Sequence, residues 1–120
     1  MTSIEFAVPT GRILNANQRL HWAKRSAMTK FLRTEASLHA HGLPAMERAH
    51  LTVAVGWPDK RRRDAMNLHP TIKACVDGFV DAGLIFDDDD TRLTGPDLRP
   101  YVAGHKGHVV LTFKFEEITA

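Results

Sequence analysis

The sequence predicts a small α+β domain with a mixed β-sheet and two main helices, in the order β-α-β-α-β-β. A chain of 120 residues can bury one hydrophobic core but not two. Apolar residues alternate in the segments expected to form strands, whereas two longer segments carry apolar residues at helical spacing. No repeat or linker divides the sequence, so residues 1–120 are expected to form a single domain.

The N-terminal half predicts a strand, a helix and a second strand. Ile4, Phe6 and Val8 alternate with polar or small residues up to Pro9, which indicates a short first strand. Residues 17–41 are expected to form a helix that ends at Gly42. Residues 51–57 alternate and predict the second strand. The expected apolar side of the helix consists of Leu20, Ala23, Ala27, Phe31 and Leu38, and that of the second strand of Leu51, Val53, Val55 and Trp57.

The C-terminal half predicts a second helix and two further strands. The helix should bury Ile72, Val76, Phe79 and Val80 and end at Gly83. The segment after Leu98 is expected to form a hairpin that turns near residues 104–107. Pro100 places the first strand of this hairpin at a sheet edge. The last strand is expected to point Val109, Leu111, Phe113 and Phe115 inward.

Composition limits the compartment and the kind of partner. Cys75 is the only cysteine, so the chain has no internal disulfide and is expected in a reducing compartment. Neither a signal peptide nor an apolar run of membrane-spanning length is evident, which favours a cytoplasmic protein without a membrane segment. Residues 1–63 carry eleven Lys or Arg against four acids, a net charge of +7, whereas residues 64–120 carry −5. This polarity indicates a polyanionic partner such as nucleic acid, or simply a solvated charge distribution.

Acidic residues flank the second predicted helix. Asp64 lies just before it, and the run Asp87 to Asp90 follows it. If the two segments meet in the fold, their carboxylates could hold a hard cation, and Mg²⁺ fits because it takes few protein carboxylates and completes its shell with water and substrate phosphate. The alternative is that the acidic run forms a solvated turn. An EF-hand loop is excluded because Arg92 and Leu98 stand where Gly and Glu are required.

Around these residues the sequence resembles the RusA-type Holliday-junction resolvases, small metal-dependent endonucleases often encoded by phages and prophages. The resemblance rests on "PDKRRRDAMNLHPTIKACVDGFVDAGLIFDDDDTRL", residues 58–93, and is supported upstream by "LNANQRLHWAKR", residues 14–25. A run of arginines ending in Asp, an Asn-Leu before a helix, a helix ending in Ala-Gly and an Asp pair after it form a specific combination. The resemblance spans most of the chain.

The resemblance implies a role for each matching residue. Asp64 and Asp88 would ligate Mg²⁺, for which Mn²⁺ could substitute, and Asp87 and Asp89 are neighbouring candidate ligands. The family has a second acid two residues after the first, but this chain has Met66 there. Either another acid, a backbone carbonyl or water takes its place, or the protein is a weak or inactive nuclease.

Lys73 matches the catalytic lysine of the family if three extra residues precede it, which Pro70 in the first helical turn would accommodate. Its ammonium would stabilise charge on the phosphate or leaving oxygen. The alternative is a surface ion pair with Asp77, four residues further along the helix. His69 is either a general base or a capping and hydrogen-bonding residue.

Several basic and polar residues are candidates for contacting DNA. The run from residue 60 to residue 63 would hold the phosphates that flank the scissile bond, although one or two of its side chains could instead lie at the rim or pair with Asp59. Trp22 and Trp57 could stack on bases or belong to a core or an interface. The expected contacts are Lys60, Arg61, Arg62 and Arg63, with Arg19, Lys24, Asn15 and Asn17 as weaker candidates.

The sequence therefore predicts a Mg²⁺-dependent endodeoxyribonuclease that resolves four-way DNA junctions in recombination and repair, and has no small-molecule substrate. Paired cuts on a two-fold symmetric junction need two sites, so a homodimer is expected. One alternative is a junction-binding protein without activity, since Met66 replaces an acid. Another is a nuclease for flaps, forks or generic duplex DNA.

Overall fold

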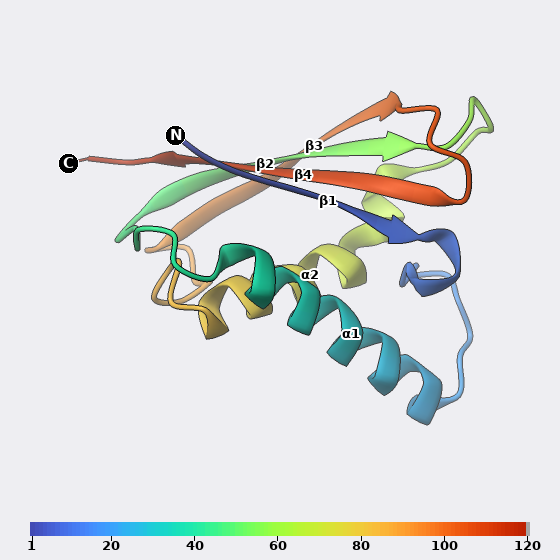
Figure 1. Cartoon of the computed structure of the whole chain (residues 1–120), viewed down its shortest axis with the longest axis horizontal. Coiled ribbons are helices and arrows are strands. Elements are labelled where there is room, and N and C mark those ends of the chain that lie inside the picture. The colour runs from blue at the N-terminus through green and yellow to red at the C-terminus, as the bar shows by residue number, and fades with distance from the viewer. Residues whose placement is uncertain (120) are drawn as a thin grey trace.

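The computed structural model describes residues 1–119 and has a four-stranded mixed sheet with two helices against one face (Figure 1). The sheet order is β1-β4-β2-β3, and the predicted α+β class and element order are confirmed. None of its helices is both long enough and apolar enough to cross a membrane. The elements are β1 (Thr2–Pro9), η1 (Thr10–Arg12), α1 (Trp22–Ala40), β2 (Ala49–Trp57), η2 (Ala65–Leu68), α2 (His69–Asp81), β3 (Leu93–Val102) and β4 (His108–Glu117).

The core lies between the sheet and the helices. The alternation predicted for the strands is confirmed, because the apolar residues of β1, β2 and β4 lie on the face that the helices cover. Phe79 of α2 packs edge-on against Phe113 and Phe115 of β4, at centroid distances of 4.9 and 5.5 Å. Aromatic contacts of this kind connect α2 directly to the middle of the sheet.

The predicted C-terminal hairpin is wrong. β3 and β4 follow one another in the chain, but β2 lies between them, with β3 parallel and β4 antiparallel to it. The alternating pattern identifies strands without identifying their partners. Pro96 and Pro100 lack the N–H group that a central strand needs, so β3 occupies the edge, as Pro100 predicted. β4 buries Val109, Leu111, Phe113 and Phe115 and takes a central position, paired with β1 and β2.

The first helix differs from its prediction in its start and its buried face. It begins at Trp22 rather than near residue 17, because the His21 ring accepts a hydrogen bond from the Ala23 amide and caps the first turn. Leu38, expected in the core, is 67% exposed, and Ala23 and Ala27 are exposed as well. The buried residues are Met28, Leu32, Ala36 and Ala40, four residues apart. This narrow stripe fits a helix that lies mainly against α2 rather than against the sheet.

The second helix matches its prediction closely. Ile72, Val76 and Phe79 are buried, whereas Val80, also expected to be buried, is only half-buried. Pro70 lies in the first turn, and Gly83 follows the last turn with φ of +78°. Gly78 faces α1 so closely that an added Cβ would lie 2.2 Å from the Arg33 carbonyl oxygen. The absence of a side chain at this position therefore sets the distance between the two helices.

Candidate nucleic-acid interface and acidic site

An open groove of about 1000 Å³ lies where β2 ends and the basic loop begins. Asn15 and Gln18 line it from the segment before α1, and Trp57 lines it from the end of β2. Arg62, Arg63 and Asp64 line it as well, together with η2. The groove therefore places two of the predicted DNA-contacting cations beside the first predicted metal ligand.

Residues 13–18 form one wall of this groove, and Thr71 of α2 holds this wall in place through hydrogen bonds. This threonine is fully buried, and its hydroxyl accepts a hydrogen bond from the Leu14 amide (2.8 Å) and donates one to the Leu14 carbonyl (2.7 Å). A third bond runs from the Ala16 amide to the Asn67 carbonyl at 2.8 Å. This role of Thr71 was not predicted, although a threonine inside an otherwise apolar helix face is a usable signal for such a bond.

The basic loop divides into one paired cation and three exposed ones. Arg63 donates to the Asp59 carboxylate at 2.7 Å and lies over the Trp57 ring, 5.1 Å from its centroid. The pKa of Asp59 lies below its ordinary value, first because of the Arg63 hydrogen bond and then because the Arg61 amide also donates to it. Lys60, Arg61 and Arg62 are exposed. The expectation that one cation of the run would pair with Asp59 is confirmed for Arg63.

Asp64 directly precedes η2 and is exposed to solvent. Its Oδ1 accepts a hydrogen bond from the Met66 amide at 3.0 Å, which caps this short helix. Met66 is 73% exposed and lines the same groove. The methionine that replaces an expected acid therefore points into the solvent-accessible space beside Asp64 instead of entering the core.

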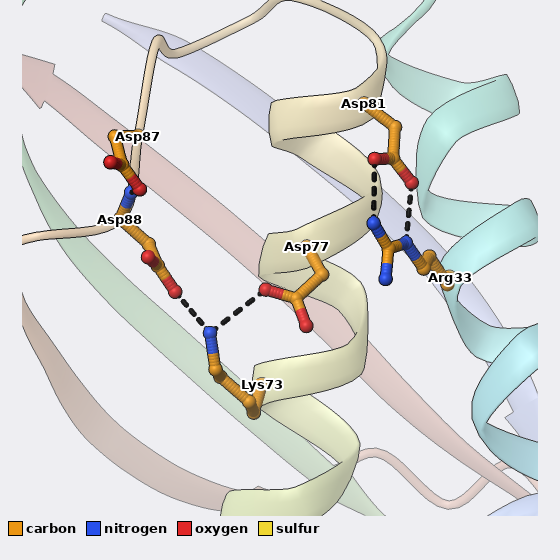
Figure 2. A network of polar contacts seen from close by, with 6 residues as sticks. All are labelled: Arg33, Lys73, Asp77, Asp81, Asp87 and Asp88. Atoms are coloured by element: carbon orange, nitrogen blue, oxygen red, sulfur yellow. Dashed lines mark hydrogen bonds and ion pairs between the residues drawn. The ribbon is translucent and has the colours of Figure 1, made fainter. Parts of the chain in front are cut away.

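Lys73 lies between two carboxylates on the side of α2 that faces the acidic loop (Figure 2). Its ammonium donates to Asp77 at 2.8 Å and also to Asp88. The pKa of Lys73 is raised by the hydrogen bond to Asp77 and then by that to Asp88, while the Lys73 hydrogen bond lowers the pKa of Asp88. The interpretation that Lys73 pairs with Asp77 is confirmed, and Lys73 also reaches the acidic loop through Asp88. Its catalytic role stays a prediction.

Hydrogen bonds within the acidic loop shape the rest of it. Asp87 accepts from the Asp88 amide at 2.7 Å, and Asp89 accepts from the amide (2.9 Å) and the hydroxyl of Thr91. The Thr91 hydroxyl is the first cause of the lowered pKa of Asp89. Such contacts are the turn chemistry of aspartate. The loop therefore has the properties of a solvated turn, while the Asp88 carboxylate is directed toward Lys73 of α2 (Figure 2).

The structure gathers the predicted metal ligands only in part. Within residues 1–119, no three His, Cys, Asp or Glu side chains are grouped in a way that would hold a metal ion. Asp64 lines the groove, whereas Asp87, Asp88 and Asp89 do not. The carboxylates of these predicted ligands are still of the kind that Mg²⁺ prefers, because this ion binds through one or two protein carboxylates and keeps several waters. The second Asp64 oxygen has no hydrogen bond within the described part of the chain, and Asp88 is held through a single oxygen.

The remaining predicted residues differ in whether they line the groove. Asn15 is half-buried in the groove, where its side chain accepts a hydrogen bond from the Asn17 amide at 2.8 Å. Asn17, Arg19 and Lys24 are exposed and lie outside the groove lining. His69 is exposed as the first residue of α2. A search for similar proteins matched the chain to no protein-family model and to no curated protein.

Proposed function

We propose that this protein is a Mg²⁺-dependent, structure-specific DNA endonuclease of the RusA type, acting on four-way junctions in recombination or repair. One observation carries the proposal: a single open groove contains the exposed carboxylate of Asp64 together with the cations Arg62 and Arg63. Phosphodiester cleavage by this route needs a metal-binding carboxylate beside cations that hold the phosphate backbone.

The basic loop would position the DNA backbone. Lys60, Arg61 and Arg62 are exposed and free to contact phosphates, whereas Arg63 is held by Asp59 and Trp57. A cation fixed in this way loses less freedom on binding than a mobile one, so it suits the innermost phosphate. The other three would add affinity without selecting sequence, because phosphate contacts carry no base information.

Asp64 and Asp88 would hold the Mg²⁺ ion, with Asp87 and Asp89 beside them, and the bound ion would supply Lewis-acid activation of the phosphate and of the attacking water. Lys73 orients the Asp88 carboxylate by direct donation. Asp77 shares the same ammonium, so it keeps Lys73 on the side of α2 that faces the acidic loop.

We further propose a homodimer as the active form. Each chain contributes one Asp64 beside the basic loop, and a four-way junction presents two strands related by a two-fold axis. Two copies related by the same symmetry would place one Asp64 at each of the opposed strands. The two cuts would then have matched geometry.

A second candidate function, junction binding without cleavage, is favoured by Met66. It is exposed in the groove beside Asp64, at the position where the resemblance implies an acid. The loss of a carboxylate weakens metal affinity and leaves phosphate contacts untouched. The two functions share salt-sensitive junction binding and differ in metal-dependent cleavage.

The test is cleavage of a labelled four-way junction with and without Mg²⁺ or Mn²⁺, using wild type, Asp64→Asn and Asp88→Asn. Glu116→Gln is the matched control, since it removes one exposed carboxylate from β4. Paired metal-dependent cuts that disappear in both Asn variants but not in the control would support the nuclease. If the wild type binds the junction but cleaves it with neither Mg²⁺ nor Mn²⁺, the protein is a junction-binding protein without nuclease activity. Preferential cutting of forks, flaps or plain duplex would change the substrate and keep the chemistry.

A further inference from the structure

One face of α1 carries a shallow hollow separate from the groove around Asp64. It has a volume of about 520 Å³ and contains three cations and no acid. Its residues are spaced by three and four along the helix, so they form a single stripe on the surface of α1. The lining consists of Trp22, Arg25, Ser26, Thr29, Lys30 and Arg33.

The cations of this stripe are largely available to a ligand. Arg33 is bound through two nitrogens to Asp81 of α2, with its Nη2 atom 2.8 Å from the carboxylate (Figure 2). Within residues 1–119, Arg25 and Lys30 form no ion pair. The positive charge of two side chains on this face is therefore unneutralised by the protein itself.

Trp22 gives the stripe an aromatic end. Its side chain is 76% exposed, and the His21 ring lies beside it with the two centroids 5.5 Å apart. An indole exposed to this extent contributes little to the hydrophobic core. It presents a flat ring beside unpaired cations.

We propose that this face of α1 binds a single-stranded stretch of nucleic acid, with Trp22 stacking on an unpaired base and with Arg25 and Lys30 contacting the phosphates that follow. An aromatic platform beside a basic track is the chemistry by which proteins bind single strands without reading sequence. Duplex DNA hides its base faces by stacking, so it could use the cations but not the ring. The stripe from Trp22 to Arg33 is about 16 Å long at 1.5 Å per residue, which is enough for several phosphates.

The place of this face relative to the groove suggests where such a strand would come from. Gln18 lines the groove and Trp22 follows four residues later, and the N-terminal end of α1 lies at the same end of the molecule as the end of β2 (Figure 1). An unpaired strand leaving a branch point held in the groove would therefore meet Trp22 first. This route rests on the proposed function, whereas the binding of a single strand to α1 does not.

The first test measures binding of a fluorescent oligothymidylate and of a duplex of equal length. Trp22→Ala should weaken binding of the single strand by about 5- to 150-fold, the range for the loss of one stacked base, and change duplex binding far less. Leu38→Ala is the control, because Leu38 is also an exposed apolar residue of α1 but lies outside the hollow. Equal affinities of wild type and Trp22→Ala for the single strand would overturn the proposal.

The second test uses charge. The double variant Arg25→Gln/Lys30→Gln should lower the slope of log affinity for the single strand against log salt by about 1.4, since each phosphate contact contributes about 0.7. Arg99→Gln/Lys114→Gln removes the same charges from exposed positions on β3 and β4 and should leave the slope unchanged. Equal slopes for the two double variants would overturn the proposal, as would burial of Trp22 by a second copy of the chain without DNA.

The outcomes separate this inference from the proposed function. If no junction is cleaved but Trp22, Arg25 and Lys30 govern single-strand binding, the proposed nuclease function is wrong and the proposed single-strand binding on α1 is supported. If junctions are cut in a metal-dependent way and none of these variants alters single-strand binding, the nuclease stands and the α1 surface fails.

Discussion

Lys73 donates a hydrogen bond to Asp88 although fifteen residues separate the two in the chain. The contact fixes the acidic loop against α2 and gives one carboxylate of the run a different environment from its neighbours. It also has a measurable electrostatic consequence, because the hydrogen bond lowers the pKa of Asp88.

Replacing Lys73 with Met should raise the pKa of Asp88 toward its ordinary value. NMR titration of the Asp88 carboxyl in wild type and Lys73→Met measures this change directly. The Asp88 interaction contributes stability above the unfolded-state pKa of about 3.9, and this contribution is lost as pH falls through the lower folded-state value. Asp88→Asn should therefore cost stability at pH 6, and the cost should shrink as pH falls below about 3.9. An unchanged Asp88 titration in Lys73→Met would contradict the contact.

Asp81→Asn should weaken the connection between the two helices only slightly. The Arg33–Asp81 pair is roughly half exposed on both sides, and such pairs contribute about 0 to 1 kcal/mol. The Arg33 hydrogen bond lowers the pKa of Asp81, so the contribution is present at neutral pH and lost in acid. Urea unfolding of wild type and Asp81→Asn at low and high salt measures the contribution of the pair to the free energy of unfolding. A loss above about 2 kcal/mol, insensitive to salt, would show that the residue does more than form a surface pair.

Gly78→Ala should destabilise the fold even though alanine favours helices. The added Cβ would lie 2.2 Å from the Arg33 carbonyl oxygen and 2.9 Å from the Ala36 side chain. Forcing the helices apart costs about 1 to 3 kcal/mol, more than the gain of about 1 kcal/mol in helix propensity. Gly11→Ala is the matched control, because its added Cβ would meet no atom within 4 Å. Denaturant unfolding measures the free energy of unfolding of both variants. Equal stabilities of Gly78→Ala and Gly11→Ala would contradict the close contact between the helices.

Thr71→Val should loosen the groove wall as well as the fold. It keeps the shape of the side chain but leaves the amide and carbonyl of Leu14 without their partner, which costs about 1 to 3 kcal/mol. Hydrogen exchange of the Leu14 amide should accelerate more than exchange in β4. Thr71→Ser retains the hydroxyl and should restore most of the protection. Slow exchange in Thr71→Val together with rapid exchange in Thr71→Ser would point to packing of the methyl group instead.

Met66→Asp tests whether the missing acid limits activity. Met66 is exposed in the groove, so a carboxylate there costs little stability and adds negative charge beside Asp64. If low affinity for Mg²⁺ limits the nuclease activity of the wild type, Met66→Asp should cut junctions at a lower Mg²⁺ concentration than wild type. Met66→Ala should not. Identical metal titrations of all three proteins would show that this position does not contribute to metal binding.

The sequence predicted those parts of the fold that periodicity determines. Alternation at Leu51, Val53 and Val55 requires one buried strand face, and the spacing of Ile72, Val76 and Phe79 requires one buried helix face. Strand pairing was not predictable in this way, because Val109 to Phe115 can be buried equally well beside β3 or between β1 and β2. The offset face of α1 has a related cause: small residues such as Ala36 are buried only because Gly78 lets the helices approach.

The candidate site was predictable where one segment supplies it and less so where two segments meet. The loop from Lys60 to Asp64 follows directly from the sequence, including one cation that pairs with Asp59. Lys73 has one partner on its own helix, Asp77, and one in the acidic loop, Asp88. Helical spacing predicts the contact with Asp77 but not the contact with Asp88. Thr71 was missed because its bonds reach back to Leu14, and no local pattern specifies a partner that far away.

The central position of β4 also determines the order in which the protein can fold during synthesis. β4 is the last strand of this sequence, and β1, the first strand, has no other neighbour in the sheet. While the ribosome is still translating residues 108–117, β1 has nothing to pair with and one side of β2 is open. The helices can meet early, but the sheet closes only after the final strand has left the exit tunnel. A stalled or shortened chain that lacks these residues would leave β1 unpaired and one edge of β2 open, and should be prone to aggregate.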